Sequence, residues 1–117
     1  MPDDPGLARL LELDGTIVDV GGGYWVKLSV RRVPASPDRP QGINYSFTLH
    51  DQNGTRVLGY DNAHRVAPRG RRSRRRGVIR DHRHSGDRSQ PYVYKDAETL
   101  ITDFWNDVYR YLESQRR

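Results

Sequence analysis

Two stretches of the chain, residues 24–33 and 43–50, alternate strictly between apolar and polar side chains. Successive side chains of a β-strand point to opposite faces of a sheet, so this alternation predicts two strands with one buried face and one face toward water. The expected inward positions are Tyr24, Val26, Leu28 and Val30 in the first strand, and Ile43, Tyr45, Phe47 and Leu49 in the second.

Near the C-terminus the apolar positions recur at helical spacing. Asp96 precedes this segment and is a good N-cap, because its side chain can accept a hydrogen bond from a free backbone N–H of the first turn. The pattern predicts an amphipathic helix of about 16 to 18 residues, long enough to cover a small sheet. Its apolar stripe consists of Leu100, Ile101, Phe104, Val108 and Leu112.

Weaker signals complete the predicted sheet. Residues 7–13 and 16–20 are expected as short strands, and the three glycines that follow favour a bend or bulge. Asn53-Gly54 indicates a hairpin, since both residues tolerate the positive φ of a type I′ turn, and residues 55–61 form the returning strand. Residues 92–94 are a candidate final strand. The predicted fold class is α+β: a small antiparallel β-sheet of four to five strands, with one C-terminal amphipathic helix packed on one face.

The length of 117 residues predicts a single domain spanning residues 1–117. The chain has no cysteine, which excludes disulfides and thiolate metal sites and fits a reducing compartment. Charged residues are scattered through the first twenty positions, so neither a signal peptide nor a membrane span is expected there. We therefore expect a cytoplasmic protein that does not engage a membrane; the oligomeric state is left open.

The positive charge is concentrated in one segment. Residues 65–88 hold ten arginines against two aspartates, a balance of +8, whereas the rest of the chain carries −3. Like-charge repulsion predicts a flexible Arg-rich loop at residues 65–80. Arginine can bind phosphate with two parallel hydrogen bonds, so the segment favours a polyanion such as RNA, although a merely solvated charge run is the alternative. The nucleic-acid-binding candidates are Arg69, Arg71, Arg72, Arg74, Arg75, Arg76, Arg80 and Arg88.

Two short polar stretches, residues 59–64 and 81–87, contain three of the four histidines. Cleavage of RNA at a 2′-hydroxyl needs a base, an acid and a cation that stabilises charge on phosphorus, and it needs no cofactor. On a strand the two histidines at 82 and 84 share a face while the arginine between them points away; in a loop this restriction disappears. Turn capping is the structural alternative. The catalytic candidates are His64, His82, His84, Arg83 and Asp61.

Two further possibilities remain open at this point. Histidines and aspartates in these stretches are permitted zinc or manganese ligands, but no spaced ligand motif supports a site and the nearby arginines oppose a cation, so no metal is assigned. Trp25 lies on the face opposite Tyr24 and is the one candidate for stacking on a base. Burial under the helix is its alternative.

The order of these motifs resembles the TumE-type toxin family of bacterial toxin–antitoxin systems. The resemblance rests on Arg31-Arg32-Val33-Pro34, Tyr60-Asp61-Asn62, His82-Arg83-His84 with Gly86, Pro91-Tyr92, and a helix containing Asp103-Phe104. The long, Arg-filled interval between Asn62 and His82 departs from the family pattern. The resemblance implies a small toxin with a cognate antitoxin, encoded beside it, and RNA or translation as the target.

The leading hypothesis is therefore a toxin that acts on RNA as a small, metal-independent endoribonuclease. Two alternatives come from other functional classes. The chain could be a non-catalytic RNA- or DNA-binding module, or a domain whose basic loop docks an acidic protein. Dependence on histidine discriminates catalysis from binding, because binding survives loss of an uncharged histidine and proton transfer does not.

Overall fold

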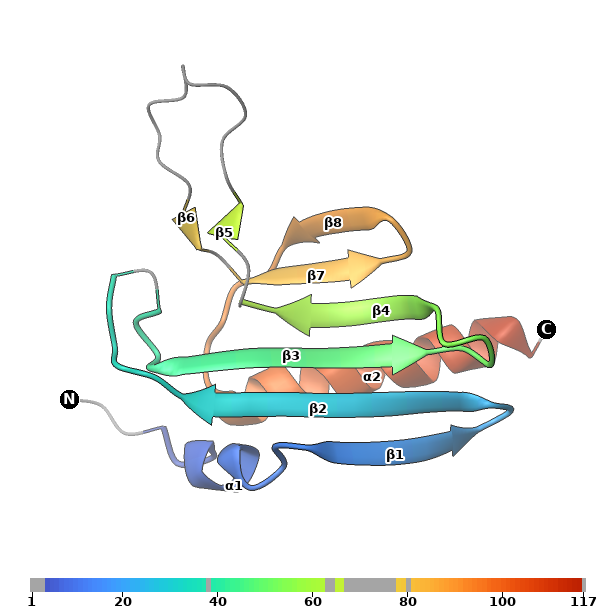
Figure 1. The fold of residues 1–117 in the computed structure, drawn as a ribbon, viewed down its shortest axis with the longest axis horizontal. Coiled ribbons are helices and arrows are strands. Elements are labelled where there is room, and N and C mark those ends of the chain that lie inside the picture. Colours follow the sequence, from blue (N-terminus) through green and yellow to red (C-terminus); the bar gives the residue numbers. More distant parts are fainter. Residues whose placement is uncertain (1–3, 38, 63–64, 67–77, 80, 117) are drawn as a thin grey trace, which may run out of the picture.

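The computed structural model describes residues 4–37, 39–62, 65–66, 78–79 and 81–116. A six-stranded sheet with the order β1-β2-β3-β4-β7-β8 forms the main layer, and every neighbouring pair is antiparallel. One long helix, α2 (Ala97–Gln115), lies behind this sheet (Figure 1). The strands are β1 (Thr16–Gly21), β2 (Tyr24–Arg32), β3 (Ile43–His50), β4 (Arg56–Asp61), β7 (His82–Ser85) and β8 (Arg88–Pro91).

The alternation of β2 and β3 places their apolar side chains in the core between sheet and helix. Seven of the eight predicted inward residues are buried, and the eighth, Tyr24, is partly buried against the same core. The residues between them face the other side of the sheet. The strands are in register, with Trp25 opposite His50 and Leu28 opposite Phe47. The predicted α+β fold class, with an antiparallel sheet and a C-terminal helix packed on one face, is confirmed.

The helix α2 begins where the sequence predicts. The side chain of Asp96 accepts a hydrogen bond of 2.7 Å from the backbone N–H of Thr99, which satisfies one of the free donors of the first turn. The apolar stripe then packs on the sheet, where Leu100, Phe104 and Val108 are fully buried. The ring of Phe104 lies 5.6 Å from that of Phe47 in an edge-to-face arrangement. The apolar face of α2 therefore belongs to the main core.

The prediction of a strand at residues 7–13 is wrong. This segment contains α1 (Leu7–Leu11), and Leu10 is buried within the core. Leu7, Leu10 and Leu11 recur at helical spacing, and a helix turns all three toward the main core. Short apolar runs are ambiguous between the two periods, and packing against the core decided this one.

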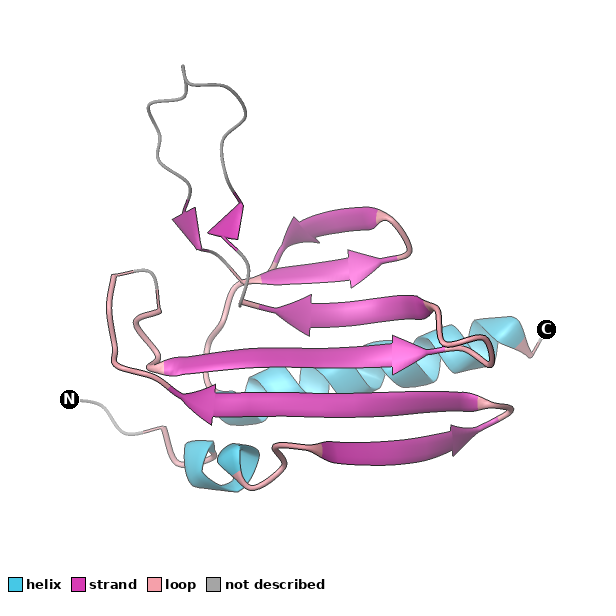
Figure 2. Cartoon of the chain, viewed as in Figure 1, coloured by secondary structure: helices cyan, strands magenta, loops and turns pink. Residues whose placement is uncertain are grey.

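The strand count and the last strand also differ from expectation. The main sheet has six strands, because the polar hairpin β7–β8 extends the sheet beyond β4. Residues 92–94, the expected last strand, do not form a strand. The four residues of β8 are all exposed, so they carry no apolar alternation that a sequence pattern could reveal. Hydrogen bonding to β7, rather than burial, determines this strand (Figure 2).

The hairpin between β3 and β4 forms at Asn53-Gly54, but not by the expected turn type. Gly54 has a φ of 83°, and no non-glycine residue of the described chain has a positive φ, so the type I′ turn is wrong. The side chain of Asp51 accepts hydrogen bonds from the backbone N–H groups of Asn53 and Thr55. These bonds let Asn53 keep a negative φ.

The Arg-rich segment joins β4 to β7. Two short strands, β5 (Arg65–Val66) and β6 (Val78–Ile79), pair with each other outside the main sheet at the base of this connection (Figure 1). Residues 67–77 and 80 lie outside the described part of the chain. The predicted flexibility of residues 65–80 therefore stays a prediction, as does the single domain.

Candidate functional site

The face of the main sheet that points away from α2, called the outer face below, carries the polar side chains that alternate with the core residues of β2 and β3. It is turned toward the reader in Figure 1. Pairing of β4 with β7 places Asp61 opposite His82 and Gly59 opposite His84. Because successive side chains alternate, both histidines and Asp61 lie on this outer face. Two motifs that are about twenty residues apart in sequence thus meet on adjacent strands.

Asp61 and His84 form a close pair. The Nε2 atom of His84 lies 3.0 Å from Oδ2 of Asp61, and both side chains are largely buried, with 19% and 11% of their surface exposed. The ring of His82 lies next to that of His84, with 6.0 Å between centroids and 29° between planes. Oδ1 of Asp61 is buried without a hydrogen-bond partner among the described residues. The arrangement therefore provides one imidazole oriented by a carboxylate, a second imidazole beside it, and a carboxylate oxygen of Asp61 that is still available to accept a hydrogen bond.

Arg56 joins this group, and sequence reasoning missed it. A register shift between Leu49 and His50 places Arg56 opposite His50, on the outer face. Its side chain crosses Gly59, where an added Cβ would lie 3.3 Å from the guanidinium nitrogen NH1. The absent side chain at Gly59 thus leaves the space that Arg56 uses. The sequence signal was the glycine that interrupts the strand pattern, since a glycine there often marks close approach of another group.

Burial lowers the pKa of His84 below the usual histidine value, and the positive charge of Arg56 acts in the same direction. The carboxylate of Asp61 opposes them by raising this pKa. A neutral His84 that donates Nε2–H to Asp61 leaves Nδ1 as a free acceptor. In chemical terms, such a pair has the geometry that a general base requires. We call Asp61, His82, His84 and Arg56 the histidine site.

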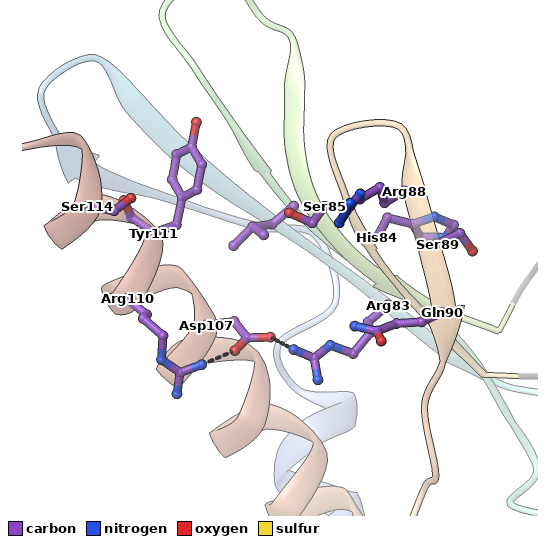
Figure 3. A pocket seen from close by; sticks show the side chains of 11 residues that line it. Arg83, His84, Ser85, Arg88, Ser89, Gln90, Asp107, Arg110, Tyr111 and Ser114 are labelled. Carbon is purple, nitrogen blue, oxygen red and sulfur yellow. Dashed lines mark hydrogen bonds and ion pairs between the residues drawn. The ribbon is translucent and has the colours of Figure 1, made fainter.

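Arg83 lies on the other side of the sheet. Its NH2 nitrogen forms an ion pair of 3.0 Å with Oδ2 of Asp107 on α2 (Figure 3). Its guanidinium carbon lies 5.7 Å from the centre of the Tyr60 ring. The strand geometry of His82-Arg83-His84 thus separates the arginine from both histidines, as expected for a strand rather than a loop. Arg83 fastens the sheet to the helix and is not part of the histidine site.

The Tyr60-Asp61-Asn62 motif divides its three residues between different tasks. The hydroxyl of Tyr60 donates a 2.6 Å hydrogen bond to Asp107 on α2. Asn62 is 1% exposed; its amide donates to the backbone carbonyl of Ile43 and accepts from the backbone N–H of Tyr45. Tyr60 and Asn62 therefore fix the end of β4 on both sides, and this holds Asp61 in place for His84.

A row of tyrosine hydroxyls on the helix side is bonded to carboxylates. Tyr45 donates to Asp81 and Tyr92 donates to Asp103, each over 2.6 Å. Burial, reinforced by the neighbouring carboxylate, raises the pKa of both tyrosines, so they remain protonated donors. Burial also raises the pKa of Asp81. The first bond ties β3 to the segment that leads into β7, and the second ties the segment after β8 to α2, so both have a structural role.

The remaining predicted residues are distributed as follows. Arg88 is exposed on β8 and lines a cavity on the helix side of the sheet. Trp25 lies on the outer face, stacked on His50 with 4.1 Å between ring centroids and 11° between planes, so it is not covered by the helix. Other predicted site residues lie outside the described part of the chain: His64, Arg69, Arg71, Arg72, Arg74, Arg75, Arg76 and Arg80.

In the described ranges, no three histidine, aspartate or glutamate side chains gather closely enough to hold a metal ion. Nor does any helix in those ranges combine the length and the apolar character needed to cross a membrane.

Fold and site together define a small α+β protein with a histidine pair on the uncovered face of an antiparallel sheet. Comparison with protein families gives its affiliation. The model of the Toxin TumE family matches residues 8–112, nearly the whole chain, and the chain belongs to this family. Membership of a toxin family implies an antitoxin partner. Searches of curated proteins and of solved structures returned no match.

Proposed function

We propose that this TumE-family toxin acts on RNA as a small endoribonuclease that uses acid–base catalysis at the histidine site. The observation that carries the proposal is the Asp61–His84 pair with His82 beside it on the outer face. Two imidazoles at this separation suit a reaction that removes one proton and delivers another. Because Arg83 points away from them, it is left out of the catalytic set.

The proposed reaction begins with His84. Its free Nδ1 takes the proton of a 2′-hydroxyl, and the 2′-oxygen attacks the adjacent phosphorus. His82, in its protonated form, gives a proton to the departing 5′-oxygen. The products are a 2′,3′-cyclic phosphate and a 5′-hydroxyl end. Arg56 stabilises the negative charge that develops on the phosphoryl oxygens, and Asp61 orients His84.

Binding is proposed to use the outer face as well. Lys27, Arg31 and Arg56 are exposed there, and cations of this kind neutralise phosphates and release counterions. Trp25 offers an aromatic ring on the same face, on which an unpaired base can stack. The Arg-rich segment leaves the main sheet directly after Asp61, so its arginines are proposed to add phosphate contacts beside the site. An RNA target implies that the protein works in the cytoplasm.

The test compares neighbouring residues on opposite faces. Purified wild-type protein, His84→Ala, His82→Ala and Arg83→Gln are incubated with a diverse RNA pool in the presence of a chelator. Each histidine variant should lower cleavage by ~10² to 10⁴-fold while RNA affinity stays nearly constant. Arg83→Gln should cleave like the wild type, although its folded state should be less stable.

Two outcomes would refute the proposal in different ways. If both histidine variants cleave normally, the histidine site is not catalytic. If the wild-type protein binds RNA tightly and cleaves none of the pool, the protein is a binding module rather than an enzyme. That alternative is supported by the exposed cations and Trp25 alone, without the Asp61–His84 pair.

A further inference from the structure

A cavity of about 690 Å³ lies between the hairpin β7–β8 and α2, mainly on the helix side of the sheet, and His84 of the histidine site is among the residues that line it (Figure 3). The helix α2 runs behind the middle strands, and the hairpin β7–β8 extends beyond it (Figure 1). Apart from Arg83, which forms an ion pair with Asp107 of α2, the side chains on the helix side of this hairpin have no bond to the helix among the described residues. They are polar, unlike the apolar residues at equivalent positions of β2 and β3. From the hairpin these are Arg83, Ser85, Arg88 and Gln90, and from α2 the cavity is lined by Asp107, Arg110, Tyr111 and Ser114.

The charges of the cavity do not balance. Three arginines and one aspartate line it. Asp107 is already shared, because its Oδ2 accepts from Arg83 and its Oδ1 lies 2.8 Å from NH1 of Arg110. The guanidinium of Arg88 has no hydrogen bond or ion pair with any described residue, and all four residues of its strand are exposed. The cavity thus presents a positive surplus with one uncommitted guanidinium, and this favours an anionic ligand.

The backbone beside the cavity also favours a peptide ligand. β8 is the last strand of the main sheet, so one of its edges has no strand partner among the described elements. An extended peptide can pair with such an edge through main-chain hydrogen bonds, and its alternate side chains then point to one face of the sheet. Side chains that point to the helix side would enter the cavity, where Leu58 and Tyr111 offer apolar surface next to the arginines.

We propose that this cavity and the β8 edge bind an extended, acidic segment of the antitoxin, with a carboxylate of that segment paired to Arg88. The inference rests on family membership and on the cavity, and it does not depend on the RNA-cleavage proposal. His84 also lines the cavity, but its Nε2 is bound to Asp61 on the outer face, whereas Arg88 lies on the helix side. Substitution of Arg88 therefore leaves the Asp61–His84 pair in place. Loss of the anchor should release the toxin from neutralisation and leave its own activity intact.

The test uses the product of the reading frame adjacent to the toxin gene as the binding partner. Its affinity is measured for wild-type protein, Arg88→Gln, Arg88→Glu and Arg9→Glu. Arg9 is exposed on α1, so Arg9→Glu reproduces the net-charge change at a position outside the cavity. We expect Arg88→Glu to weaken binding at least tenfold, Arg88→Gln to weaken it less, and Arg9→Glu to have no effect. Although the sequence suggested Arg88 as a nucleic-acid contact, it lies on the helix side, away from the outer face proposed to bind RNA. RNA affinity and RNA cleavage should therefore be unchanged in all four proteins.

Hydrogen exchange on the complex identifies the bound segment. Residues 88–91 should gain protection, together with a partner segment that contains Asp or Glu. Equal affinity of Arg88→Glu and wild type, or a protected partner segment without acidic residues, would overturn the proposal. A neighbouring product that does not bind the wild-type protein would also overturn it. If Arg88→Glu instead weakens RNA binding, the cavity is an RNA site and not an antitoxin anchor.

Discussion

The two faces of the six-stranded sheet differ in how they use polar side chains. On the helix face, several polar groups near the core reach a partner on another element, as Tyr60 and Arg83 do with Asp107 and Tyr92 does with Asp103. On the outer face, the polar groups cluster with one another, and Asp61 keeps one oxygen without a partner in the described chain. The same strands thus supply polar groups that are bonded to neighbouring elements on one side, and on the other side the group that we propose to be catalytic, in which one carboxylate oxygen has no described partner.

This difference shows that position along a strand, and not chemical type, decides the task of a residue. His82, Arg83 and His84 follow one another in sequence, yet the arginine fastens the sheet to α2 while the histidines face away from it. A buried polar group without a partner costs free energy, so evolution tolerates it chiefly where function needs it. The comparison therefore predicts that helix-face changes alter stability and that outer-face changes alter activity or RNA binding.

The largest effect on stability should come from Phe104→Ala. The side chain of Phe104 is fully buried and contacts the rings of Phe47 and Tyr60. Its removal leaves a cavity, and we expect a loss of ~3 to 5 kcal/mol in the free energy of unfolding, measured by denaturant titration. Ser29→Ala on the outer face is the control, with an expected change within about 0.5 kcal/mol. Similar losses in both variants would contradict the division between faces.

Replacing each of the two tryptophans should distinguish the two faces by comparing RNA affinity with stability. Trp25→Ala should weaken RNA binding by ~1 to 3 kcal/mol, because an aromatic stacking surface is lost, with little change in stability. Trp105→Ala should do the reverse, since Trp105 packs beside Phe104 on α2. Affinity for a single-stranded oligoribonucleotide and the unfolding midpoint are measured for both. Normal RNA affinity of Trp25→Ala would remove stacking from the binding proposal.

A smaller stability effect should follow from Tyr60→Phe. The substitution deletes the 2.6 Å hydrogen bond to Asp107 but preserves the ring. We expect a cost of about 0.5 to 1.5 kcal/mol in the free energy of unfolding. Tyr109 is 61% exposed, so Tyr109→Phe is a matched control that should have almost no effect. Equal stability of the two variants would show that the bond to Asp107 contributes little.

The finest distinction concerns the pH dependence of cleavage. Burial and Arg56 lower the pKa of His84. His84 should therefore stay neutral at pH values below the usual histidine pKa, and cleavage should be lost only when the pH falls through the lowered pKa. Arg56→Gln removes one lowering influence and should move this acidic limb to higher pH. Arg9→Gln, remote on α1, should leave it in place. A limb that does not move in Arg56→Gln would separate His84 from the observed ionisation.

Much of the helix face followed from the sequence, because its signals are local. The alternation in β2 and β3 identified their buried residues, and the helical spacing after Asp96 identified the stripe on α2. In each case burial repeats at the period of the element itself, so a single segment carries the information. Sequence also indicated that His82 and His84 share one face if they lie on a strand. The structure places them on β7, where they do.

Tertiary structure alone decided which groups meet on the outer face. The pairing register of β4 with β7 brings Asp61 to His84, and the shifted register at His50 brings Arg56 across Gly59. Register depends on hydrogen bonds and packing between segments that are distant in sequence, and a shift of one residue would reverse the face of every side chain. The sequence by itself therefore determined the elements, the charge and the chemical types available, whereas the assembled sheet decided that Asp61, His84 and Arg56 form one site.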